Sequence, residues 1–207
     1  MPSPDSSTQA PPEGPGTFPR LLPWLLLLGG IAGALASLVL TIEKLQLAAD
    51  TTYVPSCSLN PVLNCGSVMT TPQAAVLGFP NSLIGIAGFT AISTIGAALL
   101  AGARFRRWFW LCLQIGLTAA LGFVHWLITQ SLYTINALCP YCMIVWAATG
   151  PIFWYVTLAN LTRFAPVRSP AVNTLLKYHS VPPTIWFLTI ITLIVERFWW
   201  YWSSLLP

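Results

Sequence analysis

Five long runs of apolar residues constrain this chain more than any other feature of its sequence. They cover residues 21–42, 81–103, about 108–133, about 139–161 and about 181–201. A helix needs roughly 20 apolar residues to cross the hydrocarbon core of a bilayer, so each run is long enough to span one. Only 7% of the 207 residues are charged and the mean hydropathy is +0.71, whereas soluble domains have about 25% charged residues. The sequence therefore predicts an all-α integral membrane protein.

The N-terminal region is expected to be a disordered cytoplasmic tail over residues 1–20. It holds six of the eighteen prolines together with glycine, serine and threonine, a composition that cannot bury enough apolar surface to fold. The first apolar run could instead be a signal peptide, since Ala34-Leu35-Ala36 matches the small-residue cleavage pattern. A signal core spans about 7 to 15 residues, but this run continues past that site to Ile42. We therefore expect it to remain as the first transmembrane helix.

The basic residues predict the orientation of the chain in the membrane. If the five segments alternate in direction, seven basic residues fall on one side and only Lys44 and Arg197 on the other. The positive-inside rule makes the first side cytoplasmic, which gives a multi-pass protein of the cell membrane with a cytoplasmic N-terminus. The net charge of +4 is small and dispersed, so we expect contact with membrane lipid and no nucleic-acid partner. The seven residues on the cytoplasmic side are Arg20, Arg104, Arg106, Arg107, Arg163, Arg168 and Lys177.

Residues 21–161 are expected to form a four-helix bundle with a long extracytoplasmic loop at 43–80. The connections at 104–107 and 134–138 are short, so the second, third and fourth segments should be antiparallel neighbours. Within the loop, a short lid helix should begin near Thr70 or Thr71 with Pro72 in its first turn. Residues 162–180 are then a cytoplasmic connection, and residues 181–207 hold a fifth transmembrane helix and the outer end of the chain.

Four of the five cysteines are predicted to lie on the outer side of the membrane. Cys57 and Cys65 are in the loop, and Cys139 and Cys142 are at the outer start of the fourth segment, while Cys112 is inside the membrane. An extracytoplasmic compartment is oxidising and permits disulfides. At a helix start, the unpaired backbone N–H groups and the positive end of the helix dipole stabilise a thiolate. The C-x-x-C pair therefore indicates reactive thiols, and its alternative is a structural disulfide or two buried apolar cysteines.

The loop pair also has more than one interpretation. Cys57 and Cys65 close the segment CSLNPVLNC, where a disulfide could simply staple the loop and contribute about 2 to 3 kcal/mol. With a second pair beneath the loop, a relay is possible in which a thiolate attacks a sulfur of the neighbouring disulfide. Four thiolates could alternatively hold a structural zinc ion, although the C-x7-C spacing suits zinc less and we assign no residue to a metal. The alternative to an enzyme is thus a non-catalytic, cysteine-stapled or zinc-binding membrane protein.

Three motifs together resemble the vitamin K epoxide reductase family, most closely its bacterial members that lack a fused thioredoxin domain. They are CSLNPVLNCGS with its C-x7-C spacing, FPNSLIGIAGF at the start of the second helix, and ALCPYC at the start of the fourth. The resemblance covers about residues 21–161, and a fifth helix is typical of the bacterial homologues. It implies a four-helix bundle around a quinone, either menaquinone or ubiquinone, capped by the cysteine-bearing loop.

The resemblance also implies a role for each matched residue. Cys57 is the outer thiol that meets a thioredoxin-like extracytoplasmic partner, and Cys65 passes electrons on to Cys139. Cys142 is the thiol beside the quinone, and Asn81 hydrogen-bonds a quinone oxygen. The implied activity is that of a membrane thiol:quinone oxidoreductase, which reoxidises its partner, reduces quinone to quinol and supports disulfide bond formation in secreted proteins.

Two further residues are candidates for contact with the quinone. Trp146 stands four residues after Cys142, where animal members of the family have a tyrosine, and its indole N–H can donate to a carbonyl oxygen but cannot accept. His125 is an ionisable group inside a span, at a depth that a quinone ring could occupy; the alternative is a neutral histidine bonded to another helix. The sequence has no GxGxxG fingerprint, haem-attachment motif or ATP-binding loop, which leaves a lipid-soluble electron acceptor.

Overall fold

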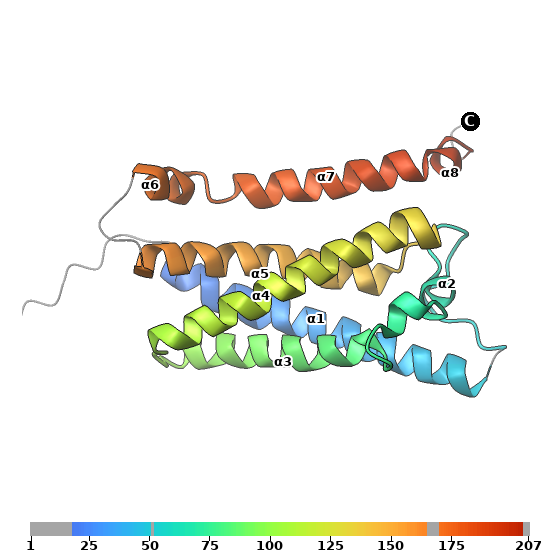
Figure 1. Cartoon of the computed structure of the whole chain (residues 1–207), viewed down its shortest axis with the longest axis horizontal. Coiled ribbons are helices and arrows are strands. Elements are labelled where there is room, and N and C mark those ends of the chain that lie inside the picture. The colour runs from blue at the N-terminus through green and yellow to red at the C-terminus, as the bar shows by residue number, and fades with distance from the viewer. Residues whose placement is uncertain (1–17, 51, 165–169, 205–207) are drawn as a thin grey trace, which may run out of the picture.

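The computed structural model describes residues 18–50, 52–164 and 170–204, and helices dominate it (Figure 1). Within these residues, four helices are long and apolar enough to cross a bilayer, the third of them together with a short π-helix that follows it. This finding confirms an all-α, multi-pass membrane protein. Residues 1–17, most of the predicted tail, lie outside the described residues. The four helices are α1 (Phe18–Ala49), α3 (Asn81–Leu100), α4 (Arg107–Thr129) and α5 (Pro140–Phe164).

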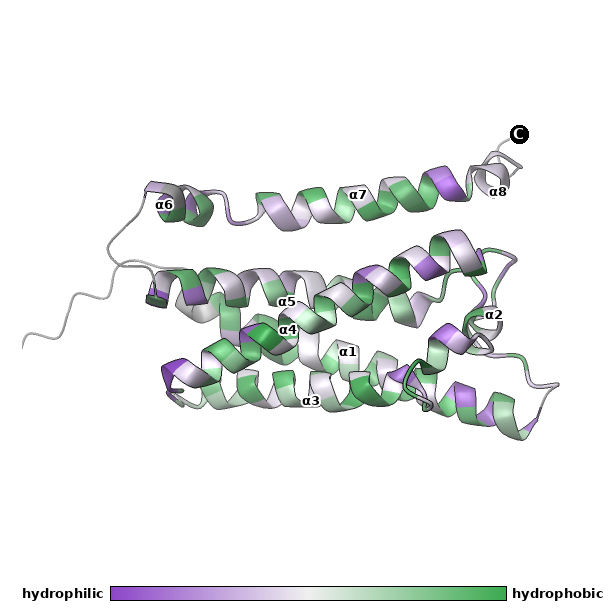
Figure 2. Cartoon of the chain, in the orientation of Figure 1, coloured by the Kyte–Doolittle hydropathy of each residue, from purple (hydrophilic) through white to green (hydrophobic). Residues whose placement is uncertain are grey.

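Helix α1 is longer than a bilayer crossing requires. Its 32 residues extend about 48 Å at 1.5 Å per residue, against roughly 30 Å of hydrocarbon. Figure 2 shows hydrophilic residues in the last turns of α1, whereas apolar residues run along the whole of α3. The polar end of α1 therefore extends past the apolar layer, next to the cysteine-bearing loop.

The predicted fifth span is not among the four helices. The chain is helical at α7 (Val181–Arg197), but this helix has 17 residues and ends at Arg197, and Phe198 separates it from the shorter α8 (Trp199–Ser204). Residues 181–201 are therefore two helices rather than one. The predicted cytoplasmic connection at 162–180 contains a helix of its own, α6 (Pro170–Lys177).

Small residues let α1 and α3 approach closely. A Cβ added to Gly30 would lie 2.6 Å from the backbone nitrogen of Ser93, and one added to Gly96 would lie 2.4 Å from the backbone nitrogen of Leu27. Such small-residue contacts are typical of helices in membranes, where lipid and protein are equally apolar and association depends on close packing. Helix α1 also packs against α5, and α5 packs against α4.

The expectation that the second and third segments are packed neighbours is wrong for most of their length. Helices α3 and α4 meet at the connection between them and diverge towards the loop (Figure 1). A short connection fixes only the adjacent helix ends, and here each helix has a different packing partner, α1 for α3 and α5 for α4. The two helices are therefore furthest apart at the end of the bundle that the loop covers.

The loop folds into two short helical segments. The first, α2 (Cys65–Met69), is capped by Asn64, whose side-chain oxygen accepts a hydrogen bond from the Ser67 backbone nitrogen at 3.0 Å. The second is a 3-10 helix, η1 (Pro72–Ala75), with Thr71 as its N-cap and Pro72 in its first turn. The predicted lid helix is therefore present where expected, but it is a single 3-10 turn. The helix α2 was not predicted from the sequence.

Helix α7 lies against the outside of the bundle. The indole Nε1 of Trp186 donates a hydrogen bond to His125 Nε2 on α4 at 3.0 Å, and Trp154 Nε1 on α5 donates to the His179 carbonyl oxygen at 2.7 Å. The Trp186 ring also fits against Gly150, where an added Cβ would lie 2.7 Å from a ring carbon. These contacts attach the C-terminal part of the chain to α4 and α5.

Candidate functional site

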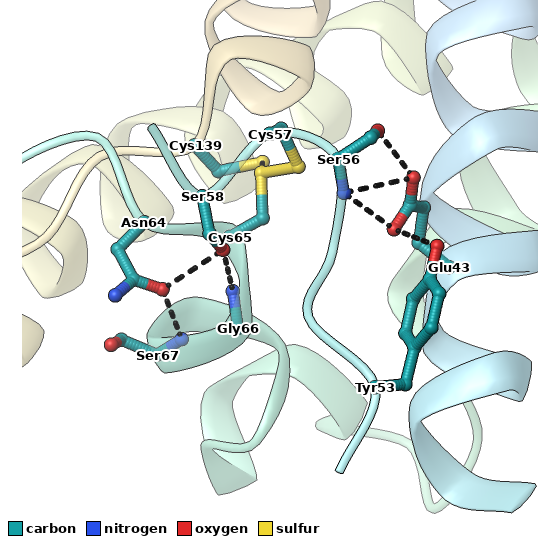
Figure 3. The surroundings of a disulfide bond; sticks show 10 residues. All are labelled: Glu43, Tyr53, Ser56, Cys57, Ser58, Asn64, Cys65, Gly66, Ser67 and Cys139. Carbon is teal, nitrogen blue, oxygen red and sulfur yellow. Dashed lines mark hydrogen bonds between the residues drawn. A yellow bond between two sulfur atoms is a disulfide. The ribbon is translucent and has the colours of Figure 1, made fainter. Parts of the chain in front are cut away.

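Three cysteine sulfurs meet above the end of the bundle (Figure 3). Cys57 and Cys65 form a disulfide, and the Sγ atom of Cys139 lies 3.1 Å from that of Cys65. Reacting atoms in a near-attack arrangement are roughly 3 to 3.5 Å apart. Cys65 and Cys139 are fully buried, and Cys57 is 5% exposed. The structure therefore brings both predicted cysteine pairs together at a distance suited to thiol–disulfide exchange.

A single β-bridge holds the loop against the start of α5. The Leu138 backbone nitrogen donates to the Val62 carbonyl oxygen at 2.7 Å, and the Asn64 nitrogen donates to the Leu138 oxygen at 2.9 Å. Leu63 and Leu138 are the paired residues. Cys65 follows two residues after one side of this bridge and Cys139 one residue after the other, so the bridge fixes the two sulfurs opposite each other.

An unusual turn delivers Cys139 to this position. Helix α4 continues into a π-helix, η2 (Gln130–Ile135), which is capped by Asn136 in the left-handed conformation with a φ of 57°. Asparagine is among the residues that tolerate this conformation. The Ser131 hydroxyl donates to the Ala137 carbonyl oxygen at 2.5 Å and closes the turn. The chain thus reverses direction sharply and places Cys139 directly before α5.

The environment of Cys139 favours its thiolate. A hydrogen bond from the Cys142 thiol holds the pKa of Cys139 below its ordinary value, and backbone hydrogen bonds from residues 141 and 142 act in the same direction, while burial opposes them. Because a thiolate is the nucleophilic form of cysteine, this lowering favours attack by Cys139. The two thiols of the C-x-x-C pair are free of disulfides, so they are the reduced pair in this state.

Glu43 near the end of α1 anchors the loop on the side of Cys57 (Figure 3). Its carboxylate accepts hydrogen bonds from the Ser56 hydroxyl at 2.5 Å, from the Ser56 backbone nitrogen at 3.1 Å and from the Tyr53 hydroxyl at 3.0 Å. The side chain is 6% exposed, and a buried carboxylate requires such partners. Glu43 was not predicted from the sequence, although a carboxylate at the end of an apolar run is a signal that could have indicated it.

A large apolar cavity lies beneath the sulfur cluster. Its volume is about 790 Å³, within the range of about 300 to 1,000 Å³ that is typical of small-molecule sites. Residues of α1, α3, α4 and α5 form its walls, and η1 lies over it. Most of its polar contributors lie at the loop end, among them Lys44, Asn81, Ser82 and Cys142, while Ser37, Cys112 and Thr149 line it further from the loop. The cavity therefore fits a mainly apolar molecule with a polar group at the loop end.

Two of the three predicted quinone contacts line this cavity. They are Asn81 and Trp146, and Cys142 lines the same space. The Asn81 amide nitrogen donates to the Gln73 carbonyl oxygen at 2.7 Å, and its oxygen accepts from the Val76 nitrogen at 3.1 Å. Asn81 therefore also ties η1 to the start of α3. An amide nitrogen carries two hydrogens, so the bond to Gln73 still leaves one donor.

His125 does not line the cavity. Its Nε2 accepts from Trp186, and its Nδ1 therefore carries the proton and donates to the Leu121 carbonyl oxygen at 2.8 Å. Both ring nitrogens face α7 or their own helix. The arrangement is the one expected of a neutral histidine bonded to another helix.

Lys44 is a cavity residue that the sequence analysis did not identify as one. It is the one charged side chain among the described residues that line the cavity, and its ammonium group donates to the Ala74 carbonyl oxygen at 3.3 Å. A lysine that follows an apolar run is usually a marker of the membrane boundary. Only the fold shows that this lysine faces the cavity rather than the lipid surface.

The sulfur cluster does not fit a structural zinc site in this state. The sulfurs of Cys57, Cys65 and Cys139 lie within 4.8 Å of one another, but two of them share a disulfide bond. Zinc binds cysteine as the thiolate, and a disulfide sulfur is not one. The donor set therefore favours redox chemistry over metal binding.

Comparison with protein families identifies the chain. Residues 24–157 match the model of the vitamin K epoxide reductase family, whose members are quinone-reducing thiol oxidoreductases. The matched region contains both cysteine pairs and all the residues that line the cavity, whereas α6, α7 and α8 lie beyond it. No curated protein matches the chain. By this match, the chain belongs to the vitamin K epoxide reductase family.

Proposed function

We propose that this protein reoxidises a thioredoxin-like partner outside the cytoplasm and transfers the electrons to a membrane quinone, thereby supporting disulfide formation in secreted proteins. One observation carries the proposal. The Cys139 sulfur lies 3.1 Å from the loop disulfide, and Cys142, one helical turn further on, lines the apolar cavity. Electrons that arrive at the loop therefore have a continuous route to a lipid-soluble acceptor.

The relay begins at the loop disulfide. A thiolate of the reduced partner attacks Cys57 and forms a mixed disulfide, and the Cys65 thiolate leaves. The second partner thiol then displaces Cys57, so that the partner is oxidised and both loop cysteines are reduced. Since Cys57 is 5% exposed, the loop must open locally before a protein partner can reach it.

The next exchange carries the electrons to the C-x-x-C pair. The Cys65 thiolate attacks Cys139 in a Cys139–Cys142 disulfide, and Cys142 leaves as a thiolate. Cys57 then attacks Cys65 and releases Cys139. The products are a loop disulfide and two free C-x-x-C thiols, which is the state that the structure describes. Re-forming the Cys139–Cys142 disulfide then delivers two electrons and two protons to the acceptor.

The cavity is proposed to hold the quinone, either menaquinone or ubiquinone, with its ring at the loop end. The remaining N–H of Asn81 and the indole N–H of Trp146 are the donors for its carbonyl oxygens, and Lys44 also lines the cavity. The polar groups orient the ring, and the apolar walls accept the tail. We assign His125 to the contact with α7 instead, because both its ring nitrogens are engaged there.

The relay requires the loop to face the extracytoplasmic side. The basic residues at the opposite end of the bundle support a cytoplasmic N-terminus, and we propose α7 as a fifth crossing. Its 17 residues lie at the lower limit of about 17 to 25 for a spanning helix. α8 begins only one residue later, with aromatic side chains of the kind found at membrane interfaces.

Reduction of a quinone by a reduced thioredoxin-like protein tests the proposal. The purified protein in detergent should convert ubiquinone to ubiquinol, measured by absorbance, and Cys142→Ser should reduce turnover to the background rate. Glu196→Gln is the control, because its side chain is exposed and lies outside both cysteine pairs and the cavity lining, and we expect less than about a twofold loss of turnover. Sustained activity in Cys142→Ser would reject the relay, and zinc binding without any turnover would favour the non-catalytic alternative.

A further inference from the structure

The C-terminal end of α7 reaches the turn that carries Cys139, although α7 lies outside the family match. Arg197 Nε donates to the Leu132 carbonyl oxygen at 2.9 Å, and its Nη2 donates to the side-chain oxygen of Asn136. A planar guanidinium with two donors fixes its acceptors more strictly than a single ammonium group can. Arg197 therefore joins the π-helix η2 to the residue that ends it.

Asn136 is the point where a small movement would matter most. It has a φ of 57° and ends η2, and only two residues separate it from Cys139. Leu138, within that short stretch, makes both hydrogen bonds of the bridge to the loop. A change in the backbone at Asn136 would thus move the bridge and the Cys139 sulfur together.

Apolar packing beside Arg197 supports the same stretch of chain, between Asn136 and Cys139. Phe198 is 1% exposed and belongs to one buried apolar cluster with Val62 and Leu138, the residues at the bridge. Trp186, near the N-terminal end of α7, is fixed to His125 by a hydrogen bond of 3.0 Å. Helix α7 is therefore held against the bundle near both of its ends, as a support that fixes a reactive turn must be.

We infer that Arg197 is a positioning residue for the thiol relay and holds Cys139 in line with Cys65. The inference rests on the proposed function. The step it serves is the attack of the Cys65 thiolate on the Cys139–Cys142 disulfide, in which the Cys65–Cys139 bond forms and Cys142 leaves as a thiolate. Electron transfer from the C-x-x-C thiols to the quinone depends on the start of α5 and the cavity, and does not need Arg197.

The two steps can be measured separately in a Cys57→Ala background. Without Cys57, forward release of Cys139 is blocked, so the Cys65–Cys139 disulfide accumulates in exchange with the Cys139–Cys142 disulfide once a short-chain ubiquinone has oxidised the C-x-x-C pair. Its rate of formation is followed by acid quenching, alkylation and mass spectrometry. We expect Arg197→Ala to slow it by about 10- to 100-fold, since misplacement of reacting atoms by about 1 Å can cost 100-fold. Oxidation of the C-x-x-C thiols by the quinone should change less than about twofold.

Two sets of variants separate positioning from general stability. Glu196→Gln alters the exposed neighbour of Arg197 and should leave both rates within about twofold of the parent. Asn136→Gly keeps the left-handed backbone accessible but removes the acceptor, so it should reproduce the Arg197→Ala defect. Asn136→Asp keeps an acceptor and should restore the rate. In the Arg197→Ala, Asn136→Gly double variant, the losses should not add, because both changes remove one contact.

Each outcome bears on a different part of the scheme. Parent-like formation of the Cys65–Cys139 disulfide in Arg197→Ala would overturn the inference. An equal loss in the exchange step and the quinone step would also overturn it, because that result indicates a general structural role. If Cys57→Ala alone formed no Cys65–Cys139 disulfide, the proposed relay itself would be rejected, and the inference with it.

Discussion

The two halves of the candidate site are constructed in opposite ways. Directional contacts hold the sulfur cluster: a disulfide, a two-bond bridge between Leu63 and Leu138, and the hydrogen bonds of Glu43 to the loop. The cavity beneath it is bounded mainly by apolar side chains of four helices, with few polar groups. One region fixes atoms in relation to one another, and the other provides a space of suitable shape and polarity.

The difference follows from the chemistry of each half. Thiol–disulfide exchange joins specific sulfur atoms, so its rate depends on their distance and alignment. A lipid-soluble acceptor must enter and leave from the bilayer, and apolar walls allow this without many specific bonds. The cavity is lined by residues of α3 and α4, which diverge towards the loop (Figure 1). We therefore expect substitutions of the cysteines themselves to act nearly all-or-none, and substitutions around the cavity to have graded effects.

The largest effect is expected for Cys65→Ala. Without this thiol, Cys57 has no disulfide for the reduced partner to attack, so turnover should fall at least about 1,000-fold. When the Cys65→Ala variant is mixed with a single-cysteine partner activated as a disulfide with 5-thio-2-nitrobenzoate, the Cys57 thiolate should attack the partner sulfur and release thionitrobenzoate. Non-reducing electrophoresis and mass spectrometry should then find the trapped partner on Cys57. A trap on Cys65 in the Cys57→Ala variant, and none in Cys65→Ala, would reverse the two roles.

A smaller and graded effect is expected for Asn81→Ala in the cavity. Loss of a buried hydrogen bond should weaken quinone use by about 1 to 3 kcal/mol, or about 5- to 150-fold in kcat/KM for quinone. Asn81→Asp is the informative companion, because a carboxylate can still accept from the Val76 nitrogen but has no N–H to donate. A normal rate for Asn81→Asp would show that Asn81 serves η1 rather than the quinone.

Several features of this site were predictable because their signals are local in the sequence. The apolar runs are continuous, so four spanning helices followed from length and composition. The C-x-x-C pair and Pro72 act over a few residues, which is why the start of α5 and the turn of η1 were expected where they occur. The spacing of the cysteine motifs also indicated the family that the comparison established.

The contacts that align the sulfurs were not predictable from the sequence alone. A bridge of one residue pair leaves no periodic pattern, and Leu63 and Leu138 are far apart in the chain. The left-handed Asn136 and the support from Arg197 depend on where α7 lies. The divergence of α3 and α4 has the same origin, since it depends on which helices pack with α1 and α5.

Glu43 was likewise not predictable from a local sequence pattern. Its substitution has the smallest expected effect and tests whether the sulfur cluster and the cavity can be perturbed separately. Its partners, Tyr53 and Ser56, are ten and thirteen residues away, so no short motif marks it as the anchor of the loop. In Glu43→Gln, the amide oxygen can still accept one bond, but the charge-assisted bonds are lost. We expect the loop to open more often, at a cost of about 1 kcal/mol in local stability, which corresponds to roughly a fivefold change in population. Reduction of the Cys57–Cys65 disulfide by dithiothreitol should therefore become about three- to tenfold faster.

Asp50→Asn is the matched control for this change. Asp50 is an exposed carboxylate of the same loop, and its bonds are to Thr52 two residues away, at 2.8 Å from the backbone nitrogen and 2.6 Å from the hydroxyl. Because those bonds do not connect the loop to α1, reduction of the disulfide should stay within about twofold of the parent rate. Oxidation of the C-x-x-C thiols by quinone should be unaffected in both variants, since the cavity walls do not include either carboxylate. If Glu43→Gln slowed the quinone step as much as it changed the loop, the separation of a directionally held sulfur cluster from a tolerant cavity would not hold.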